Sequence, residues 1–379
     1  MKKNNKNKKT KVFVALSGGV DSSVSAALLK ERGYDVTGVF IKVWHPDSSL
    51  NYYRDKPLCQ WKQDRLDAMR VCAKLEISFL MFDFEKEYKK EIIDYMISEY
   101  KEGKTPNPDV MCNKQIKFGV FLKKAIEMGA DYIATGHYAK RNPKIPNFKI
   151  QKIKLLQAKD KNKDQSYFLW TLTQEQLKYS FFPIGEYEKL KVRKIAEKFG
   201  LPTARKKDSQ GLCFIGKLDM ADFLKNYIKE KNGDVLDKSG EIIGYHNGIV
   251  FFTIGQRHGF TITDKSAYDK PYYIVSKNIL NNTITVSHKN ALTISRIGED
   301  KKKIKIKDIN WINGKIPNMN KKYKARIRYR QLLQDCKIIK NSVIDDYEIK
   351  FDKFQNTAAL GQSIVVYDGE ECLGGGVII

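Results

Sequence analysis

Residues 12–30, VFVALSGGVDSSVSAALLK, decide the fold of this chain. The apolar run at 12–16 has the composition of a buried parallel strand. Helix-forming residues fill 20–30, and Gly33 lies where the C-terminus of a helix favours glycine. The next apolar run, YDVTGVFIKVW at 34–44, predicts a second buried strand. The stretch is therefore expected to form a strand–helix–strand unit with a right-handed crossover.

The turn between this strand and helix, Ser17-Gly18-Gly19, predicts an anion-binding site. The N-terminus of a helix presents unpaired N–H groups and a positive dipole end, and two glycines let a ligand approach the backbone. The patterns G-x-x-x-x-G-K-[ST] and G-x-G-x-x-G are both absent. Ordinary P-loop kinases, GTPases and Rossmann dehydrogenases are therefore disfavoured, and the turn has to bind its anion without the lysine of a P-loop.

Length and charge indicate a protein of two or three domains with a polyanionic partner. The 379 residues are 42% hydrophobic. No run approaches the roughly 20 apolar residues of a membrane helix, and no signal peptide is evident. We therefore expect a cytoplasmic protein that is not bound to a membrane. The net charge is +25, with six lysines in a tail at 2–11, which favours a nucleic acid as partner. The same positive charge would also arise in an organism whose proteins generally use lysine as the common surface residue.

The order of the predicted elements indicates an α/β fold with additional β-rich parts. Strands and helices alternate from residue 12 to about residue 140, which is typical of a doubly wound parallel sheet. Glycine turns and short strands follow, which predicts a small central domain and a C-terminal β-barrel. The expected division is a disordered basic tail at 1–10, a first domain at 11–215, a central domain at 216–284 and the barrel at 285–379.

A second segment with candidate chemistry is KTPNPDVMCNKQIKFG, residues 104–119. The prolines on either side of Asn107 predict a rigid extended loop, with no helix before Asp109. Asp109 and Cys112 are close enough in sequence to share a pocket. The carboxylate could move a proton there, and Lys114 could favour the thiolate. An Asp N-cap in front of a buried cysteine explains the same spacing equally well.

The six cysteines are scattered without a C-x-x-C pair, at positions 59, 72, 112, 213, 336 and 372. This spacing excludes a zinc ribbon and argues against a secreted disulfide framework. Cys213 lies in KKDSQGLCFIG, residues 206–216, where a core role is the commoner one. Joint action of Cys112 and Cys213 would have to arise from the tertiary structure.

Residues 301–330 give the clearest physical signal for nucleic acid, with twelve Lys or Arg residues against one acid, Asp308. Alternation in KYKARIRYR predicts a strand that presents five cations on one face: Lys322, Lys324, Arg326, Arg328 and Arg330. Such a face favours phosphate binding over a charged edge strand that resists aggregation. The segment KDKNKDQSYFLW (159–170) is explained, without further context, as a solvated loop before a core helix. In FTIGQRHG (252–259), Gln256, Arg257 and His258 form a predicted turn after a strand that could contact phosphate but could equally lie on the surface.

Seven segments, taken in order, resemble the tRNA-specific 2-thiouridylase family. SGGVDSS is similar to the signature of PP-loop ATP pyrophosphatases in general. Six further segments narrow the resemblance from this large superfamily to the one family: TPNPDVMCNKQIKFG, ATGHYA, KDQSYFL, DSQGLCFIG, FTIGQRHG and GQSIVVYDGEECLGGGVI. The similarity covers nearly the whole chain from residue 11. It implies a PP-loop domain of the adenine nucleotide alpha hydrolase-like type, a small central domain and a tRNA-binding β-barrel.

The resemblance implies an enzyme that replaces O2 of the wobble uridine, position 34 of the tRNAs for Glu, Gln and Lys, by sulfur. ATP would adenylate the oxygen, giving AMP and pyrophosphate. Cys213 would carry a persulfide sulfur received from a sulfur-relay protein or cysteine desulfurase. The terminal sulfur would attack C2 or be released as sulfide by Cys112, and the two cysteines would finish as a transient Cys112–Cys213 disulfide. The implied enzyme is a monomer that uses ATP and Mg²⁺ and has no metal site of its own, although an iron–sulfur cluster on Cys112 and Cys213 stays an open alternative.

The resemblance also assigns site residues. ATP would be bound by Gly136, by Ile41, where the family has methionine, and by the loop residues Ala15, Leu16, Ser17, Gly18, Gly19, Val20, Asp21 and Ser22. Asp21 would help to hold pyrophosphate and Mg²⁺. Asp109 would act as acid or base and would contact the flipped target base together with Asn107 and Pro108. Contacts to tRNA would come from His137, Lys163, Asp164, Gln165, Arg328, Tyr329 and Gln362. The role of the basic segment at 141–154 is open.

Two further classes of protein are consistent with the sequence. One is a different PP-loop adenylating enzyme, such as a tRNA-lysidine synthetase, a 4-thiouridine synthetase or an amidotransferase synthetase. The motifs around Cys112 and Cys213 argue against the lysidine synthetase, which would need neither cysteine. The other class is a noncatalytic RNA-binding protein that keeps a relic nucleotide fold, and ATP cleavage that depends on tRNA would separate it from an enzyme.

Overall fold

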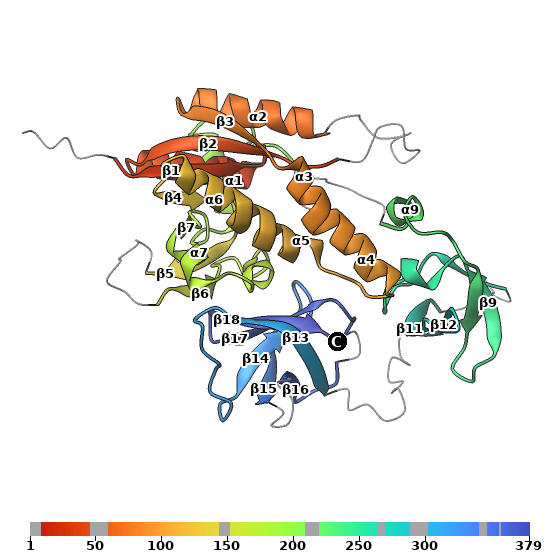
Figure 1. Ribbon diagram of the computed structural model, residues 1–379. Helices are drawn as coiled ribbons and strands as arrows, with labels where there is room; N and C mark the ends of the chain where they lie inside the picture. The colour runs from red at the N-terminus through yellow and green to blue at the C-terminus, as the bar shows by residue number, and fades with distance from the viewer. Residues whose placement is uncertain are drawn as a thin grey trace, which may run out of the picture.

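The computed structural model describes residues 9–45, 60–143, 152–208, 220–263, 270–288, 302–340, 347–355 and 358–379. It contains a parallel sheet covered by helices, a small central sheet and a six-stranded barrel (Figure 1). The predicted fold class, a doubly wound parallel sheet followed by a small central domain and a C-terminal β-barrel, is confirmed. Within the described ranges, no helix has the length and apolar character needed to cross a membrane.

The first sheet is parallel throughout and has the strand order β3-β2-β1-β4-β7. Its strands are β1 (Lys11–Leu16), β2 (Asp35–Lys42), β3 (Ser78–Asp83), β4 (Tyr132–Ala134) and β7 (Ser180–Phe181). The chain adds strands on one side of β1 and then returns to add β4 and β7 on the other. Ligands of open α/β sheets bind beyond the carboxyl ends of the strands at such a switch point, which is where the glycine-rich turn follows β1.

Helices cover both faces of this sheet, so alternate strand residues enter two separate hydrophobic clusters. Phe13, Val39 and Ile41 face one cluster, and Val14 and Leu16 face the other. The first cluster is covered by α3 (Glu85–Tyr88), the π-helical η2 (Lys89–Asp94), α4 (Tyr95–Lys101), α5 (Pro108–Met111), the π-helical η3 (Cys112–Val120) and α6 (Phe121–Glu127). The second is covered by α1 (Val20–Glu31), α2 (Gln60–Lys74) and α8 (Lys189–Lys198).

The helical run at 108–127 begins inside the segment for which an extended loop and no helix before Asp109 were predicted. The helix begins at Pro108 rather than after it, because the missing N–H of a proline costs nothing in the first turn. Asn107 is the N-cap, and its Oδ1 accepts a hydrogen bond of 3.3 Å from the backbone N–H of Val110. Cys112 is buried behind this first turn. The cysteine is therefore buried as one of the two explanations required, but the cap is Asn107 and not Asp109.

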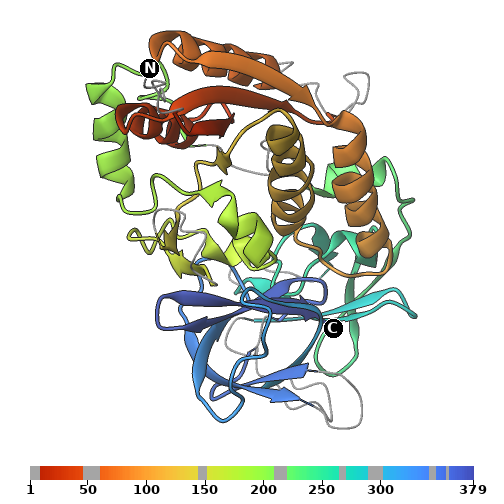
Figure 2. The same ribbon diagram turned by 60° about the vertical axis from the view of Figure 1, so that its left-hand side comes forward.

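The central domain is a mixed five-stranded sheet with the order β10-β9-β8-β12-β11. It consists of α9 (Met220–Lys225), β8 (Gly233–Leu236), β9 (Ile242–His246), the short 3₁₀ helix η5 (Ile249–Phe251), β10 (Phe260–Ile262), β11 (Tyr272–Asn278) and β12 (Thr283–His288). Its η5 segment contacts α4 of the first domain. Figures 1 and 2 both show this domain beside the end of α4 and next to the barrel.

The C-terminal barrel closes because β13 pairs with both β16 and β18. Its strands are β13 (Lys303–Trp311), β14 (Tyr323–Arg326), β15 (Gln334–Lys340), β16 (Tyr347–Phe351), β17 (Ser363–Asp368) and β18 (Glu371–Ile378). A hairpin of the first domain, β5 (Ala139–Asn142) and β6 (Lys154–Gln157), pairs with the beginning of β18. This shared sheet, together with ion pairs such as Lys140–Glu370 at 2.9 Å, holds the barrel against the first domain.

The prediction of a strand face with five cations was wrong. The strand ends at Arg326, whose side chain is 4% exposed and forms an ion pair with the buried Asp164 of the first domain. The two exposed lysines pair with acids of the barrel, Lys322 with Asp352 at 3.1 Å and Lys324 with Asp335 at 3.0 Å. The alternating pattern contains no information on the other domain, so it could not predict that Arg326 is buried in an ion pair with Asp164.

Substitution Asp164→Ala is expected to lower the free energy of unfolding by about 3–5 kcal/mol, because Arg326 would stay buried without its partner charge. Asp164 also accepts hydrogen bonds from the backbone N–H of Ala158 and from the hydroxyl of Ser166, at 3.0 and 2.9 Å. Urea denaturation measures the loss. Asp335→Ala, which breaks an exposed pair, is the matched control and should cost far less. Equal losses in the two variants would contradict the structural role of Asp164.

Candidate functional site

The glycine-rich turn presents the N-terminus of α1 without a side-chain cap. Gly19 is the N-cap of the helix, in an extended conformation (φ −97°, ψ 164°), and has no side chain that could cap the helix. The Ser23 hydroxyl donates to the Gly19 carbonyl at 2.8 Å, and the Ser17 N–H donates to the Ser22 hydroxyl at 3.2 Å. These bonds hold the turn in shape and leave N–H groups for an anion.

Two glycines are required by the packing around this turn. Gly18 has a φ of +73°, and a Cβ on it would lie 2.3 Å from the carbonyl oxygen of Asp64. Gly136 follows β4, and a Cβ there would lie 2.6 Å from the backbone nitrogen of Ser22. The segment after β4 therefore packs directly on the first turn of α1. Ile41 is 1% exposed on β2. These residues are brought to the nucleotide loop region as the resemblance implies, and their contact with ATP stays a prediction.

The carboxylate of Asp21, in the first turn of α1, is held by two residues that are distant in sequence. The Tyr138 hydroxyl donates to Oδ1 at 2.8 Å. Lys189 Nζ, from the first residue of α8, donates to both carboxylate oxygens at 2.7 and 2.8 Å. Sequence reasoning missed Lys189 because it lies 168 residues from Asp21 and outside the quoted motifs.

The network continues from Lys189 to Asp208. Lys189 is 2.9 Å from Asp208, which is also bound by Lys163 and by Arg193, each at 2.7 Å. Partial burial would raise the pKa of Asp208, but the hydrogen bonds from Lys163 and Lys189 outweigh it and lower that pKa to about 2. Asp208 is therefore ionised at neutral pH and keeps these cations in place. It directly precedes residues 209–219, which lie outside the described residues.

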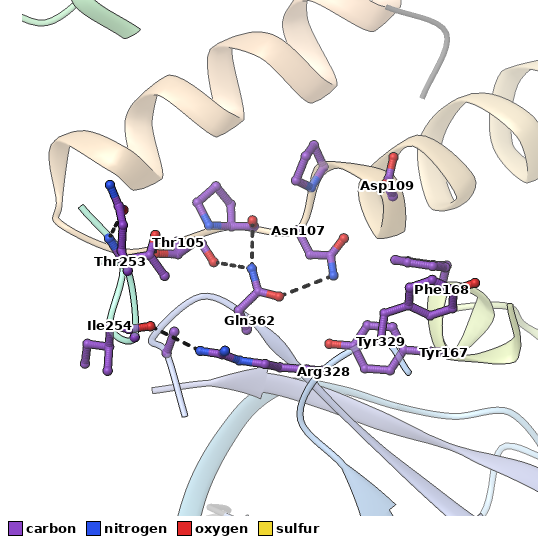
Figure 3. A pocket seen from close by; sticks show the side chains of 15 residues that line it. Thr105, Asn107, Asp109, Tyr167, Phe168, Thr253, Ile254, Arg328, Tyr329 and Gln362 are labelled. Carbon is purple, nitrogen blue, oxygen red and sulfur yellow. Dashed lines mark hydrogen bonds between the residues drawn. The ribbon is translucent and has the colours of Figure 1, made fainter. Parts of the chain in front are cut away.

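A cavity of about 460 Å³ lies where the three parts of the chain meet (Figure 3). This volume is within the range of small-molecule sites and suits one nucleotide-sized group. The lining residues come from the segment before α5, from the 3₁₀ helix η4 (Ser166–Leu169), from the central domain and from the barrel. They are Thr105, Pro106, Asn107, Pro108, Asp109, Tyr167, Phe168, Thr253, Ile254, Gly255, Gln256, Arg328, Tyr329, Ala359 and Gln362.

Gln362 of the barrel holds the proline-rich segment at the cavity. Its Nε2 donates to the carbonyls of Thr105 and Pro106 at 2.8 and 3.1 Å, and the Asn107 amide donates to its Oε1 at 3.5 Å (Figure 3). The Thr105 N–H also donates to the Leu360 carbonyl at 2.8 Å. Contact with the barrel therefore places Asn107 and, at the start of α5, Asp109.

Aromatic rings form the opposite side of the cavity. The rings of Phe168 and Tyr329 are 4.7 Å apart, and Tyr167 meets Phe168 edge-on at 5.3 Å. The Tyr167 hydroxyl donates to the Ser363 carbonyl at 2.9 Å, and burial raises the pKa of this phenol. The predicted core role of this aromatic run is confirmed for Tyr167, which is 1% exposed, but the sequence did not predict that the run also lines a cavity. Exposed aromatic faces are the usual platform for an unpaired base.

The central domain closes the third side with residues 253–256. The Thr253 hydroxyl is 3.1 Å from the Thr105 hydroxyl, and Arg328 Nη2 donates to the Ile254 carbonyl at 3.2 Å. Burial lowers the pKa of Arg328 from its ordinary value. The FTIGQRHG segment, for which a surface turn was one of two explanations, therefore belongs to the cavity through four of its residues.

Lys277 of the central domain connects the segment before α5 with the segment at 253–256 by hydrogen bonds to residues next to each. Its ammonium donates to the Gly103 carbonyl at 3.0 Å and to the Phe252 carbonyl. Gly103 leads into the proline-rich segment, and Phe252 directly precedes Thr253. Burial lowers the pKa of Lys277 to about 8.

The stability of the wild-type chain, relative to Lys277→Met, is expected to rise between pH 8 and about 10.5. The folded chain releases the Lys277 proton near pH 8, whereas the unfolded chain keeps it up to the ordinary value of 10.5. In this interval the unfolded state binds more protons, so a higher pH favours the folded state. Urea denaturation at several pH values measures the difference. The exposed Lys238→Met serves as control, and a difference that falls with pH would contradict the assignment.

The three predicted catalytic residues have different positions. Asp109 lines the cavity in the first turn of α5. Cys112, one turn further on, is fully buried in the cluster that contains Val110 and Ile116. Cys213 lies outside the described residues, so its pairing with Cys112 stays a prediction. Within the part of the chain that the structure describes, no group of three or more His, Cys, Asp or Glu side chains could hold a metal ion.

Six of the residues assigned by resemblance to the base or tRNA line the cavity, and four do not. Those four are His137, Lys163, Asp164 and Gln165. His137 is buried, with Nδ1 2.8 Å from the Thr135 hydroxyl, and burial lowers its pKa. The Gln165 side chain accepts from the Tyr138 N–H at 3.0 Å. Because Tyr138 also binds Asp21, the segment at 163–165 is connected to the glycine-rich turn, and its contacts with tRNA stay predictions.

Comparison with known proteins identifies three consecutive domains. Residues 10–217 match the tRNA methyl transferase HUP domain, residues 221–288 the tRNA methyl transferase PRC-barrel domain, and residues 301–378 the aminomethyltransferase beta-barrel domain.

Full-length relatives carry a more specific name, tRNA-specific 2-thiouridylase MnmA. The protein from Pseudomonas paraeruginosa is 43% identical over 98% of this chain and 95% of its own length. The protein from Thiobacillus denitrificans is 43% identical over 97% of this chain and 99% of its own length. Among solved structures, a 4-thiouridine synthetase in complex with RNA and with bound ATP has 17% identity and a TM-score of 0.32, covering 57% of this chain and 50% of its own.

Proposed function

Since this chain belongs to the tRNA-specific 2-thiouridylase family, we propose that it uses ATP to replace O2 of the wobble uridine, U34, by sulfur in the tRNAs for Glu, Gln and Lys. The observation that carries this proposal is the cavity between the three domains. It combines Asn107, Pro108 and Asp109 of the first domain with Arg328 and Tyr329 of the barrel. Modification of an RNA base requires such a pocket for the unstacked base.

The cavity can bind a uracil ring through its two kinds of lining. Tyr329 and Phe168 supply a stacking surface, which tolerates any base. The Asn107 amide supplies a polar edge for selection, and its position is set by Gln362. Arg328 also lines the cavity, and its guanidinium can bind the backbone phosphate next to the uracil ring. Asp109 lies at the same cavity and would transfer the proton that accompanies attack on C2.

The activation step is assigned to the turn at 17–22. An oxo group on a pyrimidine does not leave unaided, so O2 first attacks the α-phosphate of ATP and displaces pyrophosphate. The uncapped N–H groups of α1 are suited to the phosphates. Mg²⁺ prefers carboxylate and phosphate oxygens, and the Asp21 carboxylate beside this turn fits it as a single protein ligand. When bound, Mg²⁺ would supply charge neutralisation on the phosphates.

Sulfur transfer is assigned to the two cysteines. The terminal sulfur of a Cys213 persulfide attacks C2, and AMP leaves with the former O2. The thiolate of Cys112 then attacks the Cys213 sulfur, which releases the thiolated base and forms a Cys112–Cys213 disulfide; an added thiol reduces this bond. Cys112 is fully buried beside the cavity-lining segment. We therefore expect its thiol to reach the cavity only after tRNA has bound.

The experiment that tests this function is nucleoside mass analysis of unmodified tRNA after incubation with the chain, ATP, Mg²⁺, a persulfide donor and a thiol reductant. We expect 2-thiouridine, together with AMP and pyrophosphate that depend on tRNA. A tRNA with cytidine at position 34 is the control and should yield neither. Methylated nucleosides, or tRNA binding without ATP cleavage, would contradict the proposal in favour of a methyl transferase or a noncatalytic RNA-binding protein.

A further inference from the structure

Lys189 has a position in the nucleotide site to which the proposed reaction assigns no role. Its side chain is 11% exposed and its ammonium lies on both oxygens of Asp21, in the first turn of α1. The backbone N–H of Lys189 donates to Asp160 at 3.0 Å, which fixes the start of α8. A lysine from a different element thus reaches the loop that lacks the lysine of a P-loop.

Anchoring of α8 does not require this contact. Val192, Ile195 and Ala196 of α8 are buried in the cluster that covers the sheet. Arg193 binds Asp208 at 2.7 Å and also donates to the carbonyls of Ala204 and Lys206, at 2.9 and 3.0 Å. The apolar face and Arg193 hold the helix, so the Lys189 side chain can change partner without releasing it.

If Lys189 moved away, the carboxylates of Asp21 and Asp208 would each still have a partner. Asp208 would keep Lys163 and Arg193. Asp21 would keep the Tyr138 hydroxyl at 2.8 Å and would be available to a metal ion. In contrast, a polyphosphate at the N-terminus of α1 would add several negative charges next to Asp21, and repulsion would oppose binding unless a cation were shared between them.

We propose that Lys189 is the phosphate-binding lysine of this site. Its ammonium neutralises Asp21, and when ATP binds it moves to the β- and γ-phosphates, the part of ATP that leaves as pyrophosphate. This assignment rests on the proposed use of ATP. It places the cation on a helix 168 residues from Asp21, which explains how the loop functions without a lysine of its own.

Isothermal titration calorimetry of the full chain, without divalent metal, tests the assignment with ATP, inorganic pyrophosphate and AMP. Lys189→Met is expected to weaken ATP and pyrophosphate about 10- to 100-fold, the usual value of a charge-assisted hydrogen bond, and to change AMP less than about twofold. Lys189→Arg should retain most of the affinity. Lys191→Met removes an exposed lysine of the same helix and should have no effect. An equal loss for AMP and ATP, or no loss, would overturn the proposal.

A double variant separates phosphate contact from simple neutralisation of Asp21. If Lys189 only screens Asp21, then Asp21→Asn combined with Lys189→Met should restore wild-type affinity for pyrophosphate, and the proposal would be overturned. If Lys189 contacts the phosphates, the double variant should bind as weakly as Lys189→Met. A wild-type chain that binds ATP but forms no 2-thiouridine would contradict the thiolation reaction and leave the role of Lys189 standing.

Discussion

Replacement of Cys213 by serine is expected to abolish the formation of 2-thiouridine, because a hydroxyl cannot carry the persulfide sulfur. Activation of the base should persist, since it depends on the turn at 17–22 and on ATP. The measurement is nucleoside mass analysis of the tRNA, together with the release of AMP and pyrophosphate. Cys112→Ala should also stop turnover, but after the sulfur has reached C2, because no thiolate would then release it from Cys213.

Cys59→Ser is the matched control for these two variants. Cys59 lies outside the motifs and, like Cys213, outside the described residues. Cys59→Ser therefore tests whether the loss of a cysteine that has no proposed role also lowers the yield of 2-thiouridine. It should leave the yield of 2-thiouridine unchanged. If Cys213→Ser formed 2-thiouridine at the wild-type rate, the sulfur would not pass through Cys213 and the proposed transfer step would be wrong.

Substitution Asp109→Asn is expected to lower the rate of thiolation by about 10²–10⁴-fold, the usual contribution of a general acid or base. The amide has the same shape as the carboxyl group but cannot transfer the proton. Asp109 lines the cavity at the first turn of α5, whereas Asn107 caps the helix. The helix should therefore remain intact, and the KM for tRNA should change little while kcat falls.

Asp234→Asn, an exposed substitution in the central domain, is the control for Asp109→Asn and should leave kcat unchanged. A rate profile against pH gives a second readout, because loss of the titrating group should remove one limb of the profile. An Asp109→Asn variant with wild-type kcat would show that the carboxylate only shapes the cavity. The same result would favour a purely structural role for this segment, as a helix start in front of a buried cysteine.

The first domain could be predicted well because its signals are local. The apolar run before Ser17, the helix after Gly19 and the glycine at position 33 all act within a few residues. The structure has β1, α1 and a left-handed Gly33 in these places. The family resemblance also named Asn107, Asp109, Arg328 and Gln362, which line one cavity in the structure, and their roles stay predictions.

The errors concern residues whose partners lie in another domain. Arg326 continues an exposed alternation in sequence, yet Asp164 draws it into the interior across 162 residues. Tyr167 is buried in the core, as the aromatic run predicts, yet the same run also lines the cavity because Phe168 packs on Tyr329 of the barrel. No pattern within a strand or helix contains these partners.

Local sequence was thus enough for an anion site at the start of a helix, because backbone N–H groups and glycines form it within one turn. The motifs added the family and the candidate chemistry. Only the tertiary structure showed that residues of three domains line one cavity and that the Lys189 ammonium lies on the Asp21 carboxylate beside the loop. The physical reason is that side-chain charge and shape act through space over a few ångströms, whatever the separation along the chain.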